Sequence, residues 1–436
     1  MLGLTSRARL ARQFQPAADH GFFGPDSVTW KVWGHPTSYI LGFARSVTIE
    51  HFDPHLAAAV VQSGGVKYRP STRYGRTLRY FALVAFGATE ETARAADVLV
   101  KVHSKAVGND PVTGSVYDAN RGSSQLWIHM TAWNSILYCY ETFGPGPLTA
   151  AEEEQFWAEC ARAAELTTAD VSTVPRSREE VRAYFEEWRP RLAASEAAQD
   201  MIRFILDIQV ALPVGMPSWQ KQALRPLTWV MSKGVVSTYP RHLRELAGLR
   251  QGPVTDALVR WPNKAIVSVL ARSMNLRLAV FSMLAPQALP VAAPALLAIP
   301  PQSPVTMTPR EAQEAYGLAV PSEAHHDLRA KQRRRVLEDG ADAALDLRYY
   351  KGVQVLGYKI GKRCHGWTVA DFELPEKARI IGIARGENEE EFVFDIEELC
   401  EGDRLIIVAA PKAHEKLDAI FAEPPEPAEN GLAERG

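Results

Sequence analysis

The chain has 436 residues, of which 46% are hydrophobic, and its 49 basic and 51 acidic residues leave a formal net charge of -2. This length exceeds what one hydrophobic core usually serves, so it predicts two domains, or one large domain with an appendage. The balanced charge removes the electrostatic argument for a general nucleic-acid-binding or anionic-membrane-binding protein, and it favours catalysis or small-ligand binding.

The cysteines are scattered singly and form no CxxC pair, so neither a zinc site nor a disulfide framework is predicted. They are Cys139, Cys160, Cys364 and Cys400. Arginines interrupt the first 14 residues, which lack the apolar run and cleavage site of a secretory signal. We therefore predict a cytoplasmic protein in a reducing compartment.

Residues 27–282 are predicted to be mostly helical, because apolar residues recur three and four positions apart. Within them, Arg73-Tyr74-Gly75-Arg76-Thr77 puts two guanidinium groups on one helical turn. Thr89 precedes two glutamates and is predicted to cap the next helix. That helix carries His103 on its apolar face, so this imidazole is expected to point inward.

A further helix is predicted to open at Ser123 or Ser124. Its apolar stripe includes His129, which is therefore expected to point inward as well. Downstream, Ser177-Arg178-Glu179-Glu180 has the S-x-x-E form of a capping box, in which the serine and the second glutamate satisfy each other's backbone amides. This pattern predicts another helix, which should stop or bend near Pro190.

An apolar stretch over residues 278–300 is long enough to cross a bilayer, but three prolines at four-residue intervals would break the helix that lipid demands. We predict a buried or packed irregular segment, with contact to a membrane surface as the alternative. Residues 286–345 are predicted to be a connector, Pro-rich at first and then a charged helix. The basic run 329–335 within it lacks interleaved aromatics, which favours a solvated helix face over nucleic-acid binding.

Short β-rich runs follow the connector and are separated by Gly and Pro. They cover residues 349–358, 378–385, 391–395 and 404–409. We predict a small α+β domain over 346–421 and a disordered acidic, Pro-rich tail over 422–436. The predicted fold class is mainly α, with a large all-helical domain over 25–285 followed by this small α+β domain.

An inward imidazole can bond a backbone carbonyl through one nitrogen and present the other to haem iron, so His103 and His129 are candidate axial ligands. The alternative is a core histidine that is satisfied by its neighbours. Arg73 and Arg76 are candidate partners of the haem propionates, with Thr77 adding a hydroxyl. Their alternative is a solvated surface pair.

Other chemistry finds little support in the sequence. No HExxH occurs, and the only ExxH runs from Glu323 to His326 in the predicted connector. His51 and His55 have helical spacing, but Pro54 is predicted to begin a new helix that leaves His51 outside it. Dinucleotide, P-loop and α/β-hydrolase motifs are absent.

A series of short motifs in the helical domain resembles the MpaB and latex-clearing-protein oxygenase family, in order and in spacing, over about residues 25–285. The motifs are Arg73-x-x-Arg76-Thr77, Phe86-Gly87, Val102-His103, Val107-Gly108, Tyr117-Asp118-Ala119, Leu126-Trp127-Ile128-His129, Val174-Pro175-Arg176-Ser177, the helix containing Tyr184, and Leu224-Arg225-Pro226-Leu227. The resemblance implies an all-α domain of haem-oxygenase type that holds haem b and cleaves carbon-carbon double bonds of isoprenoid chains with dioxygen.

Carried onto this chain, the resemblance makes His103 the first choice for the axial iron ligand, with Arg73, Arg76 and Thr77 lining the opposite or propionate side. His129 becomes a pocket residue and the fallback ligand. Two departures put polyisoprene cleavage in doubt. Rubber-cleaving members have lysine where this chain has Arg76, and no carboxylate follows the first turn of the predicted helix over residues 54–62.

The C-terminal region resembles the TrkA-C (RCK C-terminal) domain over about residues 350–421. The motifs are Gly366-Trp367-Thr368, Leu374-Pro375, the run 380–385, and Glu401-Gly402-Asp403 leading into a strand. The resemblance implies a module that dimerises and binds a small regulatory ligand.

The predicted function is a haem b-dependent oxygenase that uses dioxygen on a lipophilic, alkene-containing substrate. The alternative is a non-catalytic haem or small-ligand sensor that signals through the C-terminal domain, and a third reading is a helical protein without a cofactor. The expected partners are the substrate, dioxygen and a second copy of the chain, with no nucleic acid.

Overall fold

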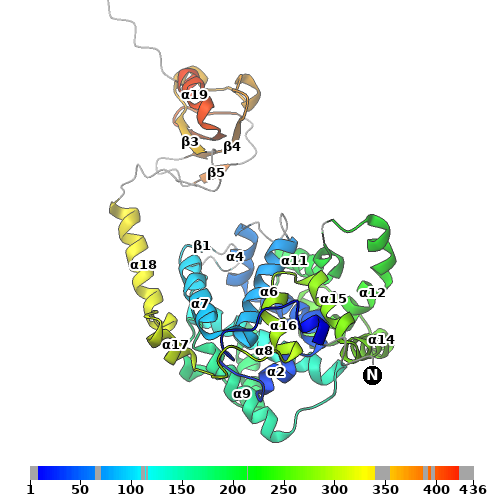
Figure 1. Ribbon diagram of the computed structural model, residues 1–436. Coiled ribbons are helices and arrows are strands. Elements are labelled where there is room, and N and C mark those ends of the chain that lie inside the picture. Colours follow the sequence, from blue (N-terminus) through cyan, green and yellow to red (C-terminus); the bar gives the residue numbers. More distant parts are fainter. Residues whose placement is uncertain are drawn as a thin grey trace, which may run out of the picture. The chain divides into compact units, whose positions relative to one another are not determined.

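The computed structural model describes residues 8–63, 70–109, 113, 116–213, 215–338, 354–385, 391–393 and 398–421. The chain divides into two compact units, Met1–Lys331 and Gln332–Gly436 (Figure 1). The division therefore falls inside the stretch predicted as connector, and the first part of that stretch belongs to the helical unit.

The first unit is built almost wholly from helices, which confirms the mainly α fold class. Its helices are α2 (Val28–Trp33), the π-helix η1 (Ser38–Gly42), α3 (Phe43–Glu50), α4 (Pro54–Ser63), α6 (Pro70–Phe86), α7 (Thr89–His103), α8 (Gly122–Phe143), α9 (Ala150–Ala164), α10 (Arg178–Trp188), α11 (Glu196–Leu206), α12 (Ser218–Ser237), α13 (Arg241–Leu246), α14 (Pro253–Arg272), α15 (Met274–Leu284), α16 (Leu289–Leu297), α17 (Pro309–Ala315) and the first part of α18 (Pro321–Glu338), which continues past Lys331. A two-stranded hairpin, β1 (Val107–Asn109) and β2 (Val116–Asp118), lies between α7 and α8.

Helix α8 runs through the middle of this unit, in contact with η1, α2, α3, α9 and α14 (Figure 1). It is buried on most of its circumference because its apolar residues surround the helix axis, unlike the single stripe of a surface helix. Trp127 and Trp133 are among its wholly buried side chains. Gly42 lets η1 approach closely, since a Cβ there would lie 2.9 Å from the Ile136 side chain.

Helix starts show which capping predictions were right. Ser177 accepts a hydrogen bond from the Glu180 amide (3.2 Å) and caps α10, as predicted. The Glu180 carboxylate bonds the Arg176 amide instead of closing the box on Ser177. The prediction that Thr89 caps α7 was wrong, because it is the first helical residue and its amide donates to Asp19 (2.8 Å). An acceptor 70 positions away leaves no local pattern in the sequence.

The apolar stretch 278–300 is packed against the helical unit, and most of it is helical. It forms the end of α15 and the short helix α16, which tolerates Pro290 in its first turn and Pro294 with no more than nine residues in all. The prediction of a packed segment is confirmed, whereas its irregular character was wrong. Among the described helices none alone is long and apolar enough to span a membrane, and the α14–α15 pair that passes this test together is bent by 110°.

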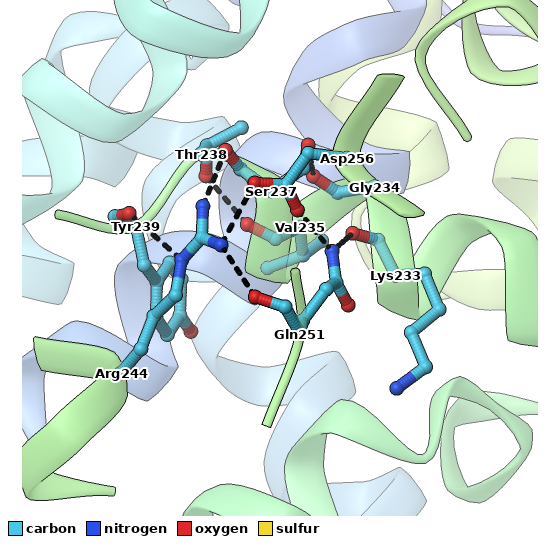
Figure 2. Close-up of polar contacts among 9 residues, drawn as sticks. All are labelled: Lys233, Gly234, Val235, Ser237, Thr238, Tyr239, Arg244, Gln251 and Asp256. Atoms are coloured by element: carbon cyan, nitrogen blue, oxygen red, sulfur yellow. Dashed lines mark hydrogen bonds and ion pairs between the residues drawn. The ribbon is translucent and has the colours of Figure 1, made fainter. Parts of the chain in front are cut away.

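A cluster of polar contacts around Arg244 fixes α13 and α14 onto the end of α12 (Figure 2). Its guanidinium donates to the carbonyls of Ser237 (3.0 Å) and Tyr239 (3.0 Å), which the end of α12 leaves without intrahelical donors. It also pairs with Asp256 in the first turn of α14 (2.8 Å), and Gln251 donates to the same carboxylate (2.7 Å). The Arg244 guanidinium thus supplies donors to the carbonyls at the end of α12 and holds the start of α14 through Asp256.

The second unit contains a four-stranded antiparallel sheet in the order β3-β6-β4-β5, with α19 (His414–Phe421). The strands are β3 (Gln354–Lys359), β4 (Ala378–Arg385), β5 (Glu391–Val393) and β6 (Arg404–Ala409). The predicted bounds of β4 and β6 are confirmed. Residues 349–353, 394–395 and the predicted disordered tail 422–436 lie outside the described residues.

A tight turn precedes β6, as the Gly-Asp pair predicts. Gly402 has φ of +94°, which a residue with a Cβ rarely adopts. Asp403 is buried, accepts from the Cys400 amide (2.8 Å), and forms an ion pair with Arg385 on β4 (2.8 Å). The Arg385 guanidinium is the main cause that lowers the pKa of Asp403.

We expect Arg244→Ala to lower the free energy of unfolding by about 2 kcal/mol, because Asp256 and two helix-end carbonyls lose a charged donor in a half-buried place. Urea denaturation of the full chain measures this change. The matched control is Arg241→Ala on the same helix, whose exposed pair with Glu245 contributes about 0.5 kcal/mol or less. Equal effects of the two substitutions would contradict the anchoring role.

Candidate functional site

Three helix ends meet where His103 lies, namely the end of α7 and the starts of α4 and α8. His103 is the last residue of α7 and is half-buried. Gln125, in the first turns of α8, donates to the Ala119 carbonyl (2.6 Å) and, over a longer distance, to Nδ1 of His103 (3.4 Å). Arg121 donates to Nδ1 of His55 on α4 (3.0 Å). These contacts bring elements from three parts of the chain to one location.

His129 occupies a different environment, inside the core. Its Nε2 donates to the Cys160 carbonyl of α9 (2.8 Å), and its ring packs 5.8 Å from that of Trp133. Complete burial lowers the pKa of His129 to about 4, so the ring is neutral at physiological pH. This arrangement corresponds to the satisfied core histidine that the sequence left open as an alternative.

The paired arginines lie on α6, whose first residue is Pro70. Arg76 is exposed and Thr77 is half-buried, while the side chain of Arg73 lies outside the described residues. Helix α6 is tied to α7 near their connecting turn by the ion pair between Arg79 and Glu91 (2.6 Å). The motif and His103 are therefore carried by consecutive, bonded helices.

A buried carboxyl group at the start of α4 was missed by the sequence analysis, which looked for one only after the first turn. Asp53 caps α4 by accepting from the His55 amide (3.1 Å) through Oδ1. The carboxyl group also interacts with the Ser124 hydroxyl of α8, and its Oδ2 is buried. Burial raises the pKa of Asp53, while the His55 amide and the charge of Arg121 oppose this shift.

The hydroxyl of Tyr184 on α10 is also buried, close to the side chain of Trp188 on the same helix. Burial raises the pKa of this phenol, and the negative charge of Asp53 adds to the shift. The two groups are therefore close enough to interact electrostatically. An Asp-Pro pair at a helix start was the only feature of the sequence that could have pointed to Asp53.

Tyr184 lines a cavity of about 700 Å³ within the helical unit. The start of α8, the helix α10, the start of α18 and the segment 168–173 form its walls. The lining residues are Gly122, Ser123, Leu126, Thr168, Asp170, Thr173, Tyr184, Glu187, Trp188, Arg191, Ser322, His325 and His326. The lining combines the rings of Tyr184 and Trp188 with hydroxyl-bearing and charged side chains.

Other predicted or excluded metal sites can now be placed. The ExxH of residues 323–326 lies on α18, and the described residues contain no group of three or more His, Cys, Asp or Glu side chains that could hold a metal ion. Pro54 is the first residue of α4 and His51 precedes it, which confirms that His51 and His55 do not share a helix.

A haem requires a neutral imidazole that can reach iron without breaking the core, and cationic donors for two carboxylates. His103 fits this requirement because it stands half-buried at a helix end. His129 does not, since its Nε2 would have to leave the Cys160 carbonyl inside closed packing. Arg76 is exposed and therefore accessible to a carboxylate. Of the two candidate histidines, His103 is the one that fits a haem.

The comparison with protein families gives one match. The profile described as "ER-bound oxygenase mpaB/B'/Rubber oxygenase, catalytic domain" matches residues 30–276, which is more than half of the chain. Comparisons with curated proteins and with solved structures give no match. The matched range lies entirely in the helical unit and includes α6, α7 and α8.

We expect acidification to destabilise the fold through His129. The unfolded ring binds a proton near pH 6.5 and the folded ring only near pH 4, so the unfolded state gains protons first and stability falls as the pH drops from 6.5 to 4. The shift corresponds to about 3 kcal/mol. Urea denaturation at several pH values measures the slope, which His129→Gln should reduce.

The control is His326→Gln, which replaces an exposed histidine of the same unit. A His129→Gln variant with the full wild-type slope would show that the buried ring is not responsible.

Proposed function

Because the chain belongs to the MpaB and rubber-oxygenase catalytic-domain family, we propose that it is a haem b-dependent oxygenase acting on a lipophilic, alkene-containing substrate. The family match over the helical unit carries this proposal. Within it, His103 is the residue that would hold the haem iron, because His129 already donates to the Cys160 carbonyl. Bound haem would supply an iron that binds and activates dioxygen.

Gln125 is the residue we assign to orient His103. Ligating histidines commonly use their second ring nitrogen in a hydrogen bond that fixes the ring, and Gln125 is placed beside Nδ1. To hold iron, His103 would keep its proton on Nδ1. Gln125 would then turn its amide oxygen to Nδ1 and give up its present donation to the Ala119 carbonyl. Arg73, Arg76 and Thr77 would hold the propionates in this proposal.

The substrate is proposed to be lipophilic because the matched family profile is named for rubber oxygenases, and rubber is a hydrocarbon polymer. Asp53 is the carboxyl group we propose for proton transfer. Burial raises its pKa, and its charge acts on the buried Tyr184 phenol.

The second candidate function is a non-catalytic haem or small-ligand sensor. Helix α18 favours it, because this helix forms a wall of the cavity with His325 and then continues past Lys331 into the second unit. A ligand in the cavity would contact the element that leads to the sheet. In this reading the second unit, which resembles a TrkA-C module, would dimerise and transmit the state of the helical unit in the cytoplasm.

We expect the purified protein, expressed with haem precursor, to show a Soret absorption band. His103→Ala should abolish or shift this band, and His129→Ala should keep it in whatever fraction of the protein stays folded. The reverse pattern would exchange the two assignments. A folded wild-type protein without the band would overturn haem binding.

Asp53→Asn separates catalysis from haem binding, since asparagine can still accept from the His55 amide and cap α4. We expect an unchanged Soret band and a loss of substrate-dependent oxygen consumption of about 100-fold, the lower end for a lost acid-base group. Undiminished consumption would remove Asp53 from the mechanism. Wild-type protein that binds haem but consumes no oxygen with isoprenoid alkenes would favour the sensor.

A further inference from the structure

The outward sides of α12 and α14 expose large apolar side chains. Three tryptophans are the clearest cases, with Trp219 70%, Trp229 53% and Trp261 79% exposed, and no other tryptophan of the described residues is exposed to this degree. Leu227, Val254, Leu258 and Val269 are exposed beside them on the same two helices. Burial of such side chains is normally favourable, so a cluster of them on a surface indicates a contact that the isolated chain lacks.

The exposed residues of α14 form a regular stripe. Val254, Leu258, Trp261 and Val269 follow helical spacing, while Val259 and Asn263 mark the buried side. Asn263 donates to the Val230 carbonyl of α12 (2.9 Å). The helix therefore differs from an ordinary amphipathic surface helix, because apolar side chains lie on its outward side as well as on its buried side.

Close packing holds α12 and α14 against each other. Gly234 of α12 lies against the Asn263 side chain so closely that a Cβ would meet it at 2.4 Å. The Arg244 cluster ties the start of α14 to the end of α12 (Figure 2). We call the exposed apolar side chains that share a side of each helix the tryptophan face, and its residues are Trp219, Trp229, Val254, Leu258, Trp261 and Val269.

The charges on these two helices have one sign toward solvent. The basic residues are Lys221, Arg225, Lys233, Arg260, Lys264 and Arg272, and none of them forms an ion pair with a described carboxylate. The single acidic residue of the two helices, Asp256, is held by Arg244 and Gln251. A chain with nearly balanced total charge therefore concentrates unpaired cations around its tryptophans.

We propose that the tryptophan face docks the helical unit onto the surface of an anionic lipid bilayer. Tryptophan favours the boundary between headgroups and acyl chains, and nearby lysines and arginines are attracted by anionic headgroups. A second copy of this chain fits less well, because a two-fold contact through the face would bring like charges together without a carboxylate between them. The docking surface is thus α12 and α14, and the packed stretch 278–300 is not part of it.

Vesicle co-sedimentation of the full chain tests the proposal, with phosphatidylcholine vesicles compared with vesicles that also contain phosphatidylserine. We expect binding to the anionic vesicles and a blue shift of tryptophan fluorescence. The Trp219→Ala/Trp261→Ala variant should weaken binding at least about tenfold, since bound apolar area is lost. Arg260→Gln/Lys264→Gln should weaken it about 20-fold on anionic vesicles only.

Matched controls alter exposed residues elsewhere on the helical unit. Val98→Ala/Val102→Ala removes exposed apolar side chains of α7, and Arg176→Gln/Arg182→Gln removes exposed cations; both should bind like wild type. Circular dichroism establishes that every variant is folded. The proposal is overturned if the wild type ignores anionic vesicles, or if the controls lose binding equally. It is also overturned if the tryptophan variant only converts a dimer to a monomer in sedimentation equilibrium.

Discussion

The helical unit is organised by the need to bury α8 on most of its surface. A helix with apolar residues around its whole circumference is stable in water only if other helices cover each side. η1, α2, α3, α9 and α14 supply that cover from distant parts of the chain. The buried polar groups of α8 then need hydrogen-bond partners inside the core, because a buried polar group without a partner lowers the stability of the fold. Trp127 donates to the Glu50 carbonyl, and His129 to that of Cys160.

The same constraint brings charged groups into the core of the unit. Arg45 of α3 is fully buried next to α8, where it donates to the hydroxyls of Ser135 (2.7 Å) and Thr238 (3.0 Å), and its guanidinium lies over the Tyr138 ring. Glu159 of α9 accepts from the Thr29 amide (2.7 Å) and hydroxyl (2.6 Å) and so satisfies the start of α2. Each charge is spread over hydrogen bonds to neutral groups, which fixes the positions of the covering helices as well as their contact with α8.

The candidate site follows from where α8 begins. Its first turn has no side-chain cap, and three other elements approach it, namely the end of α7, the start of α4 and the helix α10. His103, Asp53 and Tyr184 are consequently close to one helix start although they come from three separate parts of the chain. The tryptophan face lies on other helices of the same unit. It exposes apolar side chains to solvent, whereas the apolar side chains of α8 are buried. The proposed oxygenase activity on a lipophilic molecule and the proposed attachment to a lipid surface can occur in one domain, and each depends on different residues.

Local patterns in the sequence were sufficient for the helical class, the Ser177 cap, the strands β4 and β6, and the family, because periodicity and turn chemistry act over a few residues. The inward position of His129 also followed from periodicity. Its hydrogen bond to the Cys160 carbonyl did not, since Cys160 lies 31 positions away. Only the tertiary structure revealed that Asp19 caps α7, that Asp53 and Tyr184 interact, and that α14 is apolar on its outward side. Those features depend on which helices pack against which faces. A periodic pattern of apolar residues predicts that a helix has an apolar face, but it does not identify the element that covers this face.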